Sequence, residues 1–328
     1  MSRVAVIGAG AWGTTLALLL AENKHQVTLW AFEKELVAEV KEFRENKRFL
    51  PGFPLPEMID VTTNFADLKG RDAYYFVVPT QHLRSVARQA AMAISESAVL
   101  VVAGKGIEEK SLKLPLEIIA EETKQENLCV LSGPNLSAEI AKGLPAAAVA
   151  ASGYAEAAKK IQSMLMSPRF RVYTNNDVVG VQLGGALKNV VAIAAGVVDG
   201  LGLGDNAKAG LMIRGLAEIT RLGAALGAKQ ETFAGLSGMG DLITTCSSRL
   251  SRNHTVGEQI ARGKKLSEIL KTMKDIAEGV PTAVAARELG KRHQVPLPIT
   301  EQVYGILYEN KDPYQAISAL MTRAAASE

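Results

Sequence analysis

Lys188 is the only charged residue among the twenty-one positions of Val178–Val198, which are mostly Gly, Ala, Val, Leu and Ile. Burial of an unpaired ammonium costs several kcal/mol, so such a lysine loses its proton, acquires a partner or faces a wet cleft. At helical spacing its neighbours on the same face include Gly184, Ala192 and Ala195, whose side chains are small. We therefore expect a helix with room for a ligand beside the amine.

Two other interpretations of this stretch remain open at this point. A run of this length can span a bilayer, where a central lysine costs about 2.5–3.5 kcal/mol on insertion scales. Gln182 and Asn189 add polarity, and neither a basic flank nor a second apolar span accompanies the run, so we do not expect an integral membrane protein. The second alternative is a buried structural lysine bonded to a carboxylate or to carbonyls.

The first half of the chain alternates short β-branched runs with amphipathic stretches, as βαβ units do. We predict strands at Arg3–Ile7, Gln26–Trp30, Ala73–Val78, Ala98–Val102, Leu128–Leu131 and Ala146–Ala151. We predict helices at Thr14–Glu22, Lys34–Arg44, Leu83–Ala93 and Leu112–Thr123, each returning the chain to a parallel sheet. The proline-rich segment Phe49–Pro56 is predicted to be a loop. This pattern indicates a doubly wound α/β domain of the Rossmann type.

After about Asn176 the strand signals stop and the sequence becomes helical. We predict a Rossmann-type domain over residues 1–176 and an all-α substrate domain over 177–328, in contact and with a ligand cleft between them. The helices of the second half are expected to break at Gly200–Asp205, Gly235–Gly240, Cys246–His254, Glu278–Thr282 and Val295–Pro298.

A glycine motif follows the first predicted strand directly. Gly8, Gly10 and Gly13 form G-x-G-x-x-G between that strand and the next helix, the setting that dinucleotide binding requires. The first glycine permits the tight turn, the second lets a pyrophosphate approach the backbone, and the third lets helix and strand pack closely. An unliganded glycine turn is the alternative, but the strand-turn-helix context favours a nucleotide.

The choice of nucleotide depends on the end of the second strand. NAD sites usually place an acidic residue there to bind the ribose 2′-hydroxyl. Glu33 lies twenty residues after Gly13, which is late, and Lys34 beside it could meet a 2′-phosphate. We expect NADPH, with NADH tolerated.

Loops after other predicted strands carry small or polar residues. In an open parallel sheet, ligands bind outside the carboxyl ends of the strands. The loops are Pro79–Gln81, Gly104–Gly106 and Gly133–Asn135. Lys105 lies between two glycines and presents a cation with little side-chain cover; a solvated turn lysine is the alternative.

Two polar sites stand out in the helical half. Asp241 follows two glycines and precedes Thr244 and Thr245, where it is a candidate functional carboxylate or a helix cap. The run Ser247–His254 contains Arg252, whose guanidinium fork suits a phosphate; an exposed polar loop is the alternative.

Composition excludes several other functions. Lys plus Arg number 37 against 34 Asp plus Glu, so the net charge of +3 gives no support to nucleic-acid binding. Cys129 and Cys246 stand far apart without metal-ligand spacing, and the histidines are scattered, so we expect no zinc site, no metal and a reducing cytoplasm. The N-terminus has no signal-peptide pattern.

With these residues assembled, the chain resembles the bacterial type of NAD(P)-dependent glycerol-3-phosphate dehydrogenase along nearly its whole length. The likeness rests on Gly8–Thr14, Lys105–Gly106, Ser132–Pro134, Gly180–Asn189, Gly215–Glu218, Gly240–Leu242, Ser251–Asn253 and Glu278–Gly279. It implies reduction of dihydroxyacetone phosphate to sn-glycerol 3-phosphate for phospholipid synthesis. It also implies a C-terminal domain like that of 6-phosphogluconate dehydrogenase, and a homodimer.

The resemblance also implies roles for particular residues. Lys188 is the acid/base, with Lys105 and Asp241 in the catalytic site. Cofactor contacts are implied for Gly8, Gly10, Ala11, Trp12, Gly13, Phe32, Lys105, Ser137, Arg252, Ile276 and Glu278. Substrate contacts are implied for Lys105, Gly133, Asn135, Lys188, Asp241, Ser251, Arg252 and Asn253, with Arg252 and Asn253 gripping the phosphate.

The chain departs from the family pattern at three positions. Asn135 stands where Ser or Thr usually follows Gly-Pro, Ser137 where Ala is common, and Ala11 where Ser is frequent. We expect backbone contacts at these positions to survive the changes. Two rival functions remain at this stage: a related hydroxyacid dehydrogenase acting on a carboxylate, and a nucleotide-sensing module without catalysis.

Overall fold

The computed structural model describes residues 1–273 and 276–323. The chain divides into two compact units. The first comprises Met1–Lys105 and Lys113–Gln182, and the second comprises Gly106–Leu112 and Leu183–Glu328. The division falls within one helix, and the predicted boundary at residue 176 stays a prediction.

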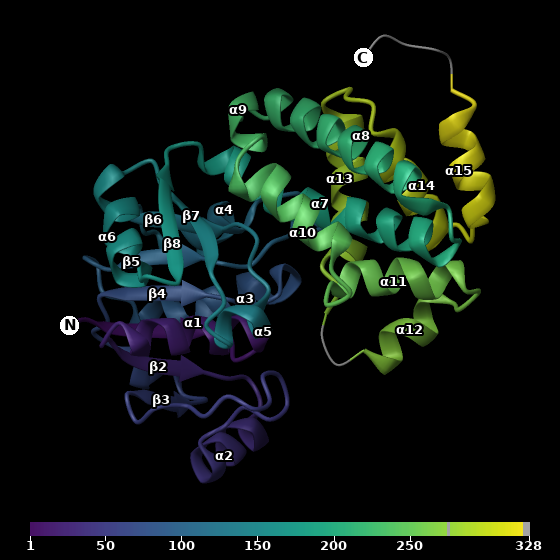
Figure 1. Cartoon of the computed structure of the whole chain (residues 1–328). Coiled ribbons are helices and arrows are strands. Elements are labelled where there is room, and N and C mark those ends of the chain that lie inside the picture. The colour runs from purple at the N-terminus through teal and green to yellow at the C-terminus, as the bar shows by residue number, and fades with distance from the viewer. Residues whose placement is uncertain (274–275, 324–328) are drawn as a thin grey trace. The chain divides into compact units, whose positions relative to one another are not determined.

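The first unit is built on one eight-stranded sheet in the order β3-β2-β1-β4-β5-β6-β7-β8 (Figure 1). The strands are β1 Arg3–Ile7, β2 Gln26–Trp30, β3 Ile59–Thr62, β4 Ala73–Phe76, β5 Val99–Val102, β6 Leu128–Ser132, β7 Ala146–Ala151 and β8 Phe170–Asn175. The first six follow the order of a dinucleotide-binding sheet, in which the chain reverses direction across the sheet after β3. The doubly wound fold is confirmed.

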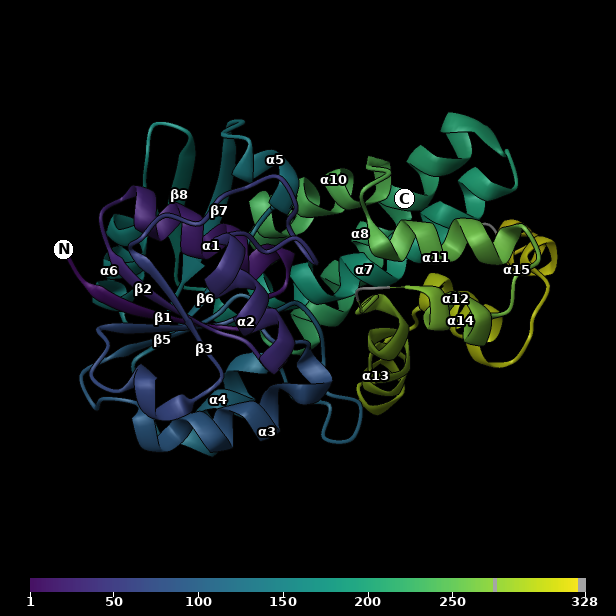
Figure 2. The same cartoon turned by 90° about the horizontal axis from the view of Figure 1, so that it is seen from below.

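Helices cover both faces of this sheet. They are α1 Ala11–Glu22, α2 Lys34–Phe43, α3 Thr80–Ala90, α4 Pro115–Thr123, α5 Ser137–Ala141 and α6 Ala155–Leu165, with 3₁₀ turns η1 Phe65–Leu68 and η2 Ala91–Ala93. In Figure 2, α3 and α4 lie side by side against one face, and α1 and α6 lie on the other. Leu16 and Leu20 of α1 and Ile161 of α6 join the strands in one core cluster.

Several details of this unit differ from the sequence predictions. The strands β3 and β8 were not predicted, and β7 pairs with β6 antiparallel, so the expectation of a wholly parallel sheet was wrong. The helix expected at Leu112 begins at Pro115, because Leu112 has a left-handed φ of 61° and proline suits the first helical position. The predicted loop at Phe49–Pro56 is confirmed, apart from a bridge between Glu45 and Pro54.

Apart from the segment Gly106–Leu112, the second unit is helical in its described part, as predicted. Its elements are α7 Val178–Gly200, which begins in the first unit, α8 Gly204–Ala225, α9 Gln230–Phe233, the π-helical turn η3 Leu236–Gly240, α10 Asp241–Ser247, α11 Arg252–Ala261, α12 Leu266–Thr272, α13 Gly279–Arg292, α14 Pro298–Tyr308 and α15 Pro313–Met321. The predicted breaks at Gly200–Asp205 and Val295–Pro298 are confirmed. That at Cys246–His254 was too long, since Ser251 caps α11 through His254 N.

The apolar helix α7 is the one described helix long and apolar enough to cross a bilayer. However, 83% of its most apolar window is buried inside the protein. Val190 and Ile193 belong to the core cluster of this unit. The helix is packed as the core helix of a globular domain would be.

A buried carboxylate on α8 holds the start of α14. Glu218 is 4% exposed and accepts hydrogen bonds from Ile299 N (2.6 Å) and Thr300 N (3.3 Å). Burial raises the pKa of this carboxyl to about 7, because desolvation outweighs the hydrogen bonds from α14. The folded state therefore binds this proton more tightly than the unfolded state does.

This raised pKa predicts a stability that falls with pH. Between pH 4.5 and about 7 the folded protein holds more protons at Glu218 than the unfolded chain, so its free energy of unfolding decreases as pH rises through that window. We expect Glu218→Gln to flatten this slope, measured by urea unfolding at pH 5 and pH 8. The exposed Glu231→Gln variant is the control. An unchanged slope in Glu218→Gln would contradict the assignment.

Candidate active site

The glycine turn has the geometry that its motif predicts. Gly8 has a φ of 118°, which an L-residue with a side chain rarely adopts, and its N–H donates to Trp30 O at the end of β2. An ideal Cβ on Gly13 would lie 1.8 Å from Gly8 O, so only glycine permits this close packing. An ideal Cβ on Gly10 would meet no described atom within 4 Å. The backbone at Gly10 is therefore open for a ligand.

These two glycines give a matched pair of variants. We expect Gly10→Ala to keep the melting temperature while weakening dinucleotide binding roughly 10-fold or more, because the methyl would occupy the space of the pyrophosphate. We expect Gly13→Ala to lower the melting temperature, because its methyl overlaps Gly8 O. Thermal melting and cofactor titration measure the two effects. Equal melting losses would show that Gly10 is structural.

The surroundings of the turn include other predicted cofactor residues. Ala11 and Trp12 open α1, and Thr15 Oγ1 donates to Ser137 O at the start of α5. Within the described chain, the buried Trp12 Nε1 has no hydrogen-bond partner, which makes it an available donor. Phe32, just after β2, is 81% exposed, as a ring that stacks on a base would be in the free protein.

Sequence reasoning missed Asn46, which holds this turn from outside the motif. Its side chain is fully buried, and Nδ2 donates to Ala9 O and to Thr14 Oγ1, both at 2.8 Å. Little in the sequence pointed to this role for Asn46, since a single Asn is common in loops and turns.

Two of the loops at the carboxyl ends of the strands meet directly. Lys105, after β5, donates from Nζ to Gly133 O, after β6, at 2.8 Å. Lys105 is half-buried, so the expectation of a largely uncovered cation was wrong. Close by, Asn135 Nδ2 donates weakly to Ala147 O at 3.4 Å. The buried Asn135 Oδ1 and Ser132 Oγ have no hydrogen-bond partner among the described residues, so polar atoms here are available to a ligand.

In the second unit Lys188 is bonded to two side chains of α10. Its Nζ lies 2.5 Å from Asp241 Oδ1 and 2.5 Å from Thr245 Oγ1. The Lys188 and Asp241 side chains are 7% and 1% exposed. Thr245 was not predicted as a site residue, although its i, i+4 spacing from Asp241 places both on one helical face.

Close helix packing brings this pair together. An ideal Cβ on Gly184 would lie 2.5 Å from Ser237 O, so α7 touches the backbone of η3 one turn before Lys188. Ala192 and Ala195 are fully buried. The expectation that small residues leave room beside the amine was wrong for these positions, because neighbouring residues fill the space. A bond from Lys188 to the buried carboxylate of Asp241 is what we expect of a structural lysine. The same bond would also hold Lys188 in position to act as a general acid.

Glycines also set α11 against α7. An ideal Cβ on Gly196 would lie 2.0 Å from His254 O, and one on Gly257 would lie 1.9 Å from Ile193 O. This contact lets Asn253 bridge two elements: Nδ2 donates to Asn189 Oδ1 at 2.9 Å, and Oδ1 accepts from Gly279 N at 2.8 Å. The amide of Asn253 therefore has a structural role, and its phosphate contact stays a prediction.

The remaining predicted residues of this unit lie at helix starts. Arg252 is exposed in the first turn of α11, directly after the buried cap Ser251. Glu278 precedes the first residue of α13, and Ile276 is exposed before it. An exposed guanidinium at a helix N-terminus is a suitable anion site.

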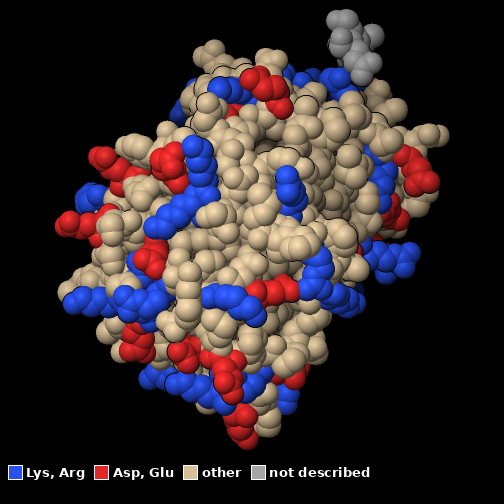
Figure 3. Space-filling model, turned by 60° about the vertical axis from the view of Figure 1, so that its left-hand side comes forward, with Lys and Arg blue, Asp and Glu red and all other residues tan. Residues whose placement is uncertain are grey.

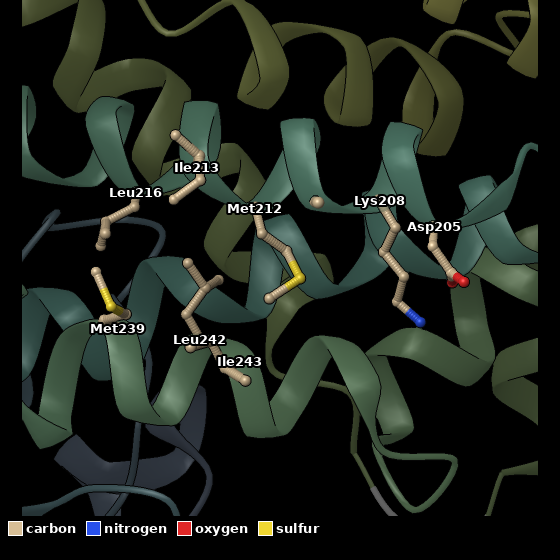
Figure 4. Close-up of a pocket in the computed structure, with 9 residues that line it drawn as sticks. Asp205, Lys208, Met212, Ile213, Leu216, Met239, Leu242 and Ile243 are labelled. Carbon is tan, nitrogen blue, oxygen red and sulfur yellow. The ribbon is translucent and has the colours of Figure 1, made fainter.

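An apolar hollow in this unit lies on another side of α10. Met212, Ile213 and Leu216 of α8 face Met239 of η3 and Leu242 and Ile243 of α10, with Asp205 and Lys208 at one end (Figure 4). A phosphorylated triose needs polar partners, so this hollow does not suit it.

Cys246, also on α10, is buried, and burial raises the pKa of its thiol to about 12, so it is not a nucleophile.

The face of the molecule drawn in Figure 3 carries charged side chains of both signs. On the face in Figure 3, Lys and Arg side chains lie among Asp and Glu side chains. Over the described residues, no group of three or more His, Cys, Asp or Glu side chains could hold a metal ion. The phosphate contact expected of Arg252 stays a prediction.

The Rossmann-type sheet with its glycine turn, followed by an all-helical unit, defines a class of NAD(P)-dependent oxidoreductases. Residues 3–158 match the family described as NAD-dependent glycerol-3-phosphate dehydrogenase N-terminus, and residues 177–318 match the corresponding C-terminus. The chain belongs to the NAD(P)-dependent glycerol-3-phosphate dehydrogenase family, whose reaction converts dihydroxyacetone phosphate to sn-glycerol 3-phosphate.

Individual relatives agree with this assignment. The glycerol-3-phosphate dehydrogenase [NAD(P)+] of Citrifermentans bemidjiense is 49% identical over 99% of this chain and 98% of its own length. The crystal structure of glycerol-3-phosphate dehydrogenase from Coxiella burnetii has a TM-score of 0.94 at 37% identity, covering 98% and 99% of the two chains. The structure of glycerol-3-phosphate dehydrogenase from Saccharomyces cerevisiae has a TM-score of 0.82 at 30% identity, and the match covers 97% of this chain and 98% of that one.

Proposed function

We propose that this chain reduces dihydroxyacetone phosphate with Lys188 as the general acid. The observation that supports the proposal is the buried pair of Lys188 and Asp241, in which Thr245 also fixes the amine. Hydride delivery to a ketone carbon leaves an alkoxide, and a positioned ammonium stabilises that charge and donates the proton. In the reverse direction the same amine accepts the proton of the alcohol.

The residues around the glycine turn fit a dinucleotide. Gly10 is open, and the N–H groups at the start of α1 are available to a pyrophosphate. Bound NAD(P)H supplies the hydride. We propose NADPH as the preferred reductant, with NADH accepted, because the basic residue Lys34 lies near the end of β2.

We assign recognition of the substrate phosphate to Arg252 and Asn253. We propose that Lys105 acts at the ketone end of the substrate. Lys105 is fixed by Gly133 O, so its charge has a defined position at the sheet edge. Arg252 is exposed and offers a planar fork that matches phosphate geometry. The proposed roles rest on the fixed position of the Lys105 ammonium and on the planar shape of the Arg252 guanidinium.

A substrate-screened assay tests the function. We expect purified protein to oxidise NADPH with dihydroxyacetone phosphate and to leave 2-keto acids unreduced. Turnover of a 2-keto acid would instead support a carboxylate-specific relative. Cofactor binding without turnover of either compound would support a sensing module.

We further propose a cytoplasmic homodimer whose product supplies the glycerol backbone of phospholipids. sn-Glycerol 3-phosphate carries the free hydroxyls that acylation requires. Sedimentation analysis of the purified chain tests the dimer.

A further inference from the structure

The loop that follows α2 is fixed beside the glycine turn. Asn46 anchors it there through Ala9 O and Thr14 Oγ1. The same side chain accepts from Phe49 N through Oδ1 at 3.1 Å, which closes a tight turn over residues 46–49. The two residues inside this turn, Lys47 and Arg48, therefore have fixed backbone positions next to the dinucleotide site.

Further bonds secure the base of this loop. Arg44 donates from Nε to Leu55 O at 3.3 Å and from its terminal nitrogen to Ile59 O at 2.9 Å, where β3 begins. Gly52 N donates to Glu45 Oε1 at 2.7 Å. A loop tied at both ends presents its outward side chains with little entropic cost on binding.

Arg48 reaches back to Glu33, which lies three residues after β2 and directly precedes α2. Its Nη1 lies 3.7 Å from Glu33 Oε1, and the two side chains are 50% and 31% exposed. At that distance the pair is an electrostatic contact rather than a hydrogen bond, and exposure makes it weak. Both groups are therefore available to a ligand. Phe32, adjacent to Glu33, is 81% exposed, so its ring is open to stacking by a base.

We propose that Glu33 and Arg48 together recognise the 2′-position of the cofactor ribose. Glu33 accepts a hydrogen bond from the 2′-hydroxyl of NADH, and Arg48 leaves Glu33 to bind the 2′-phosphate of NADPH. The inference rests on the dinucleotide site of the proposed function and deepens it. An acidic residue near the end of β2 is the usual partner of a ribose hydroxyl, and an arginine nearby accommodates a 2′-phosphate. Because the two groups neutralise one another, neither cofactor is excluded.

Binding of two nucleotide fragments tests this recognition without catalysis. We expect Arg48→Met to weaken adenosine 2′,5′-bisphosphate binding roughly 10-fold in titration calorimetry, while ADP binding changes less than about two-fold. We expect Glu33→Gln to strengthen 2′,5′-bisphosphate binding several-fold, because a carboxylate that repels the phosphate is removed. In steady state, the ratio of kcat/KM for NADPH to that for NADH should move in the same directions.

Two neighbouring lysines provide the controls. Lys47→Met removes the same charge one position away, from a side chain that lies over the Phe43 ring at 3.7 Å, and should leave the fragment preference unchanged. Lys34→Met tests the other cation near the end of β2. The inference is wrong if Lys34→Met carries the loss, or if Arg48→Met weakens both fragments equally. Normal fragment binding without turnover of dihydroxyacetone phosphate would contradict the proposed function and leave this inference standing.

Discussion

Lys188→Ala is expected to lower kcat for dihydroxyacetone phosphate by roughly 10²-fold or more, because the proposed proton donor to the alkoxide is removed. Cofactor affinity should remain near native, because Lys188 is proposed to act on the substrate and not to bind the dinucleotide. Steady-state kinetics and NADPH titration measure the two quantities.

The same variant must also lose stability. Removing Lys188 leaves Asp241 buried without its 2.5 Å partner, and breaking a buried pair costs about 3–5 kcal/mol. A lower kcat alone is therefore ambiguous, because partial unfolding would also reduce activity.

A double variant separates the two causes. Lys188→Ala with Asp241→Ala removes both charges, so the melting temperature should recover relative to Lys188→Ala while kcat stays low. If activity recovers together with stability, Lys188 is a structural lysine. Near-native kcat in the single variant would exclude it as the acid.

The parts of the fold that could be predicted are those specified by local sequence. β5 is a continuous apolar run, typical of a parallel strand buried on both faces, and Gly8 and Gly13 each meet a steric requirement within the motif itself. β8 was missed although Phe170 and Val172 alternate with exposed residues, because an edge strand carries polar residues that weaken the pattern. The antiparallel direction of β7 depends on tertiary pairing, which no local pattern encodes.

In the candidate site, too, features specified by local sequence could be predicted, whereas contacts between distant residues could not. Lys188 could be proposed as a candidate because a lone charge in an apolar run is visible in the sequence. Its bond to Asp241 could not, since 53 positions separate them and the contact depends on the backbone approach at Gly184. Asn46 escaped prediction for a related reason: its function lies in bonds to a motif 37 positions away.

Arg252→Lys is expected to lower kcat/KM for dihydroxyacetone phosphate by roughly 10-fold to 10³-fold, while turnover of unphosphorylated dihydroxyacetone changes little. A guanidinium binds a phosphate through two parallel hydrogen bonds, and an ammonium cannot reproduce that geometry. Arg252 is exposed at the first turn of α11, so the substitution should not affect folding.

Arg249→Lys is the matched control, since Arg249 is an exposed arginine three positions earlier that is not assigned to the phosphate. It should leave both substrates unchanged. The contrast between phosphorylated and unphosphorylated substrate is decisive, because a loss confined to the phosphorylated compound can arise only where the phosphate is bound. If Arg252→Lys reduces turnover of both compounds equally, Arg252 serves the nucleotide or the fold. If it reduces neither, the phosphate is held by the fixed cation Lys105, and α11 contributes only the bridge through Asn253.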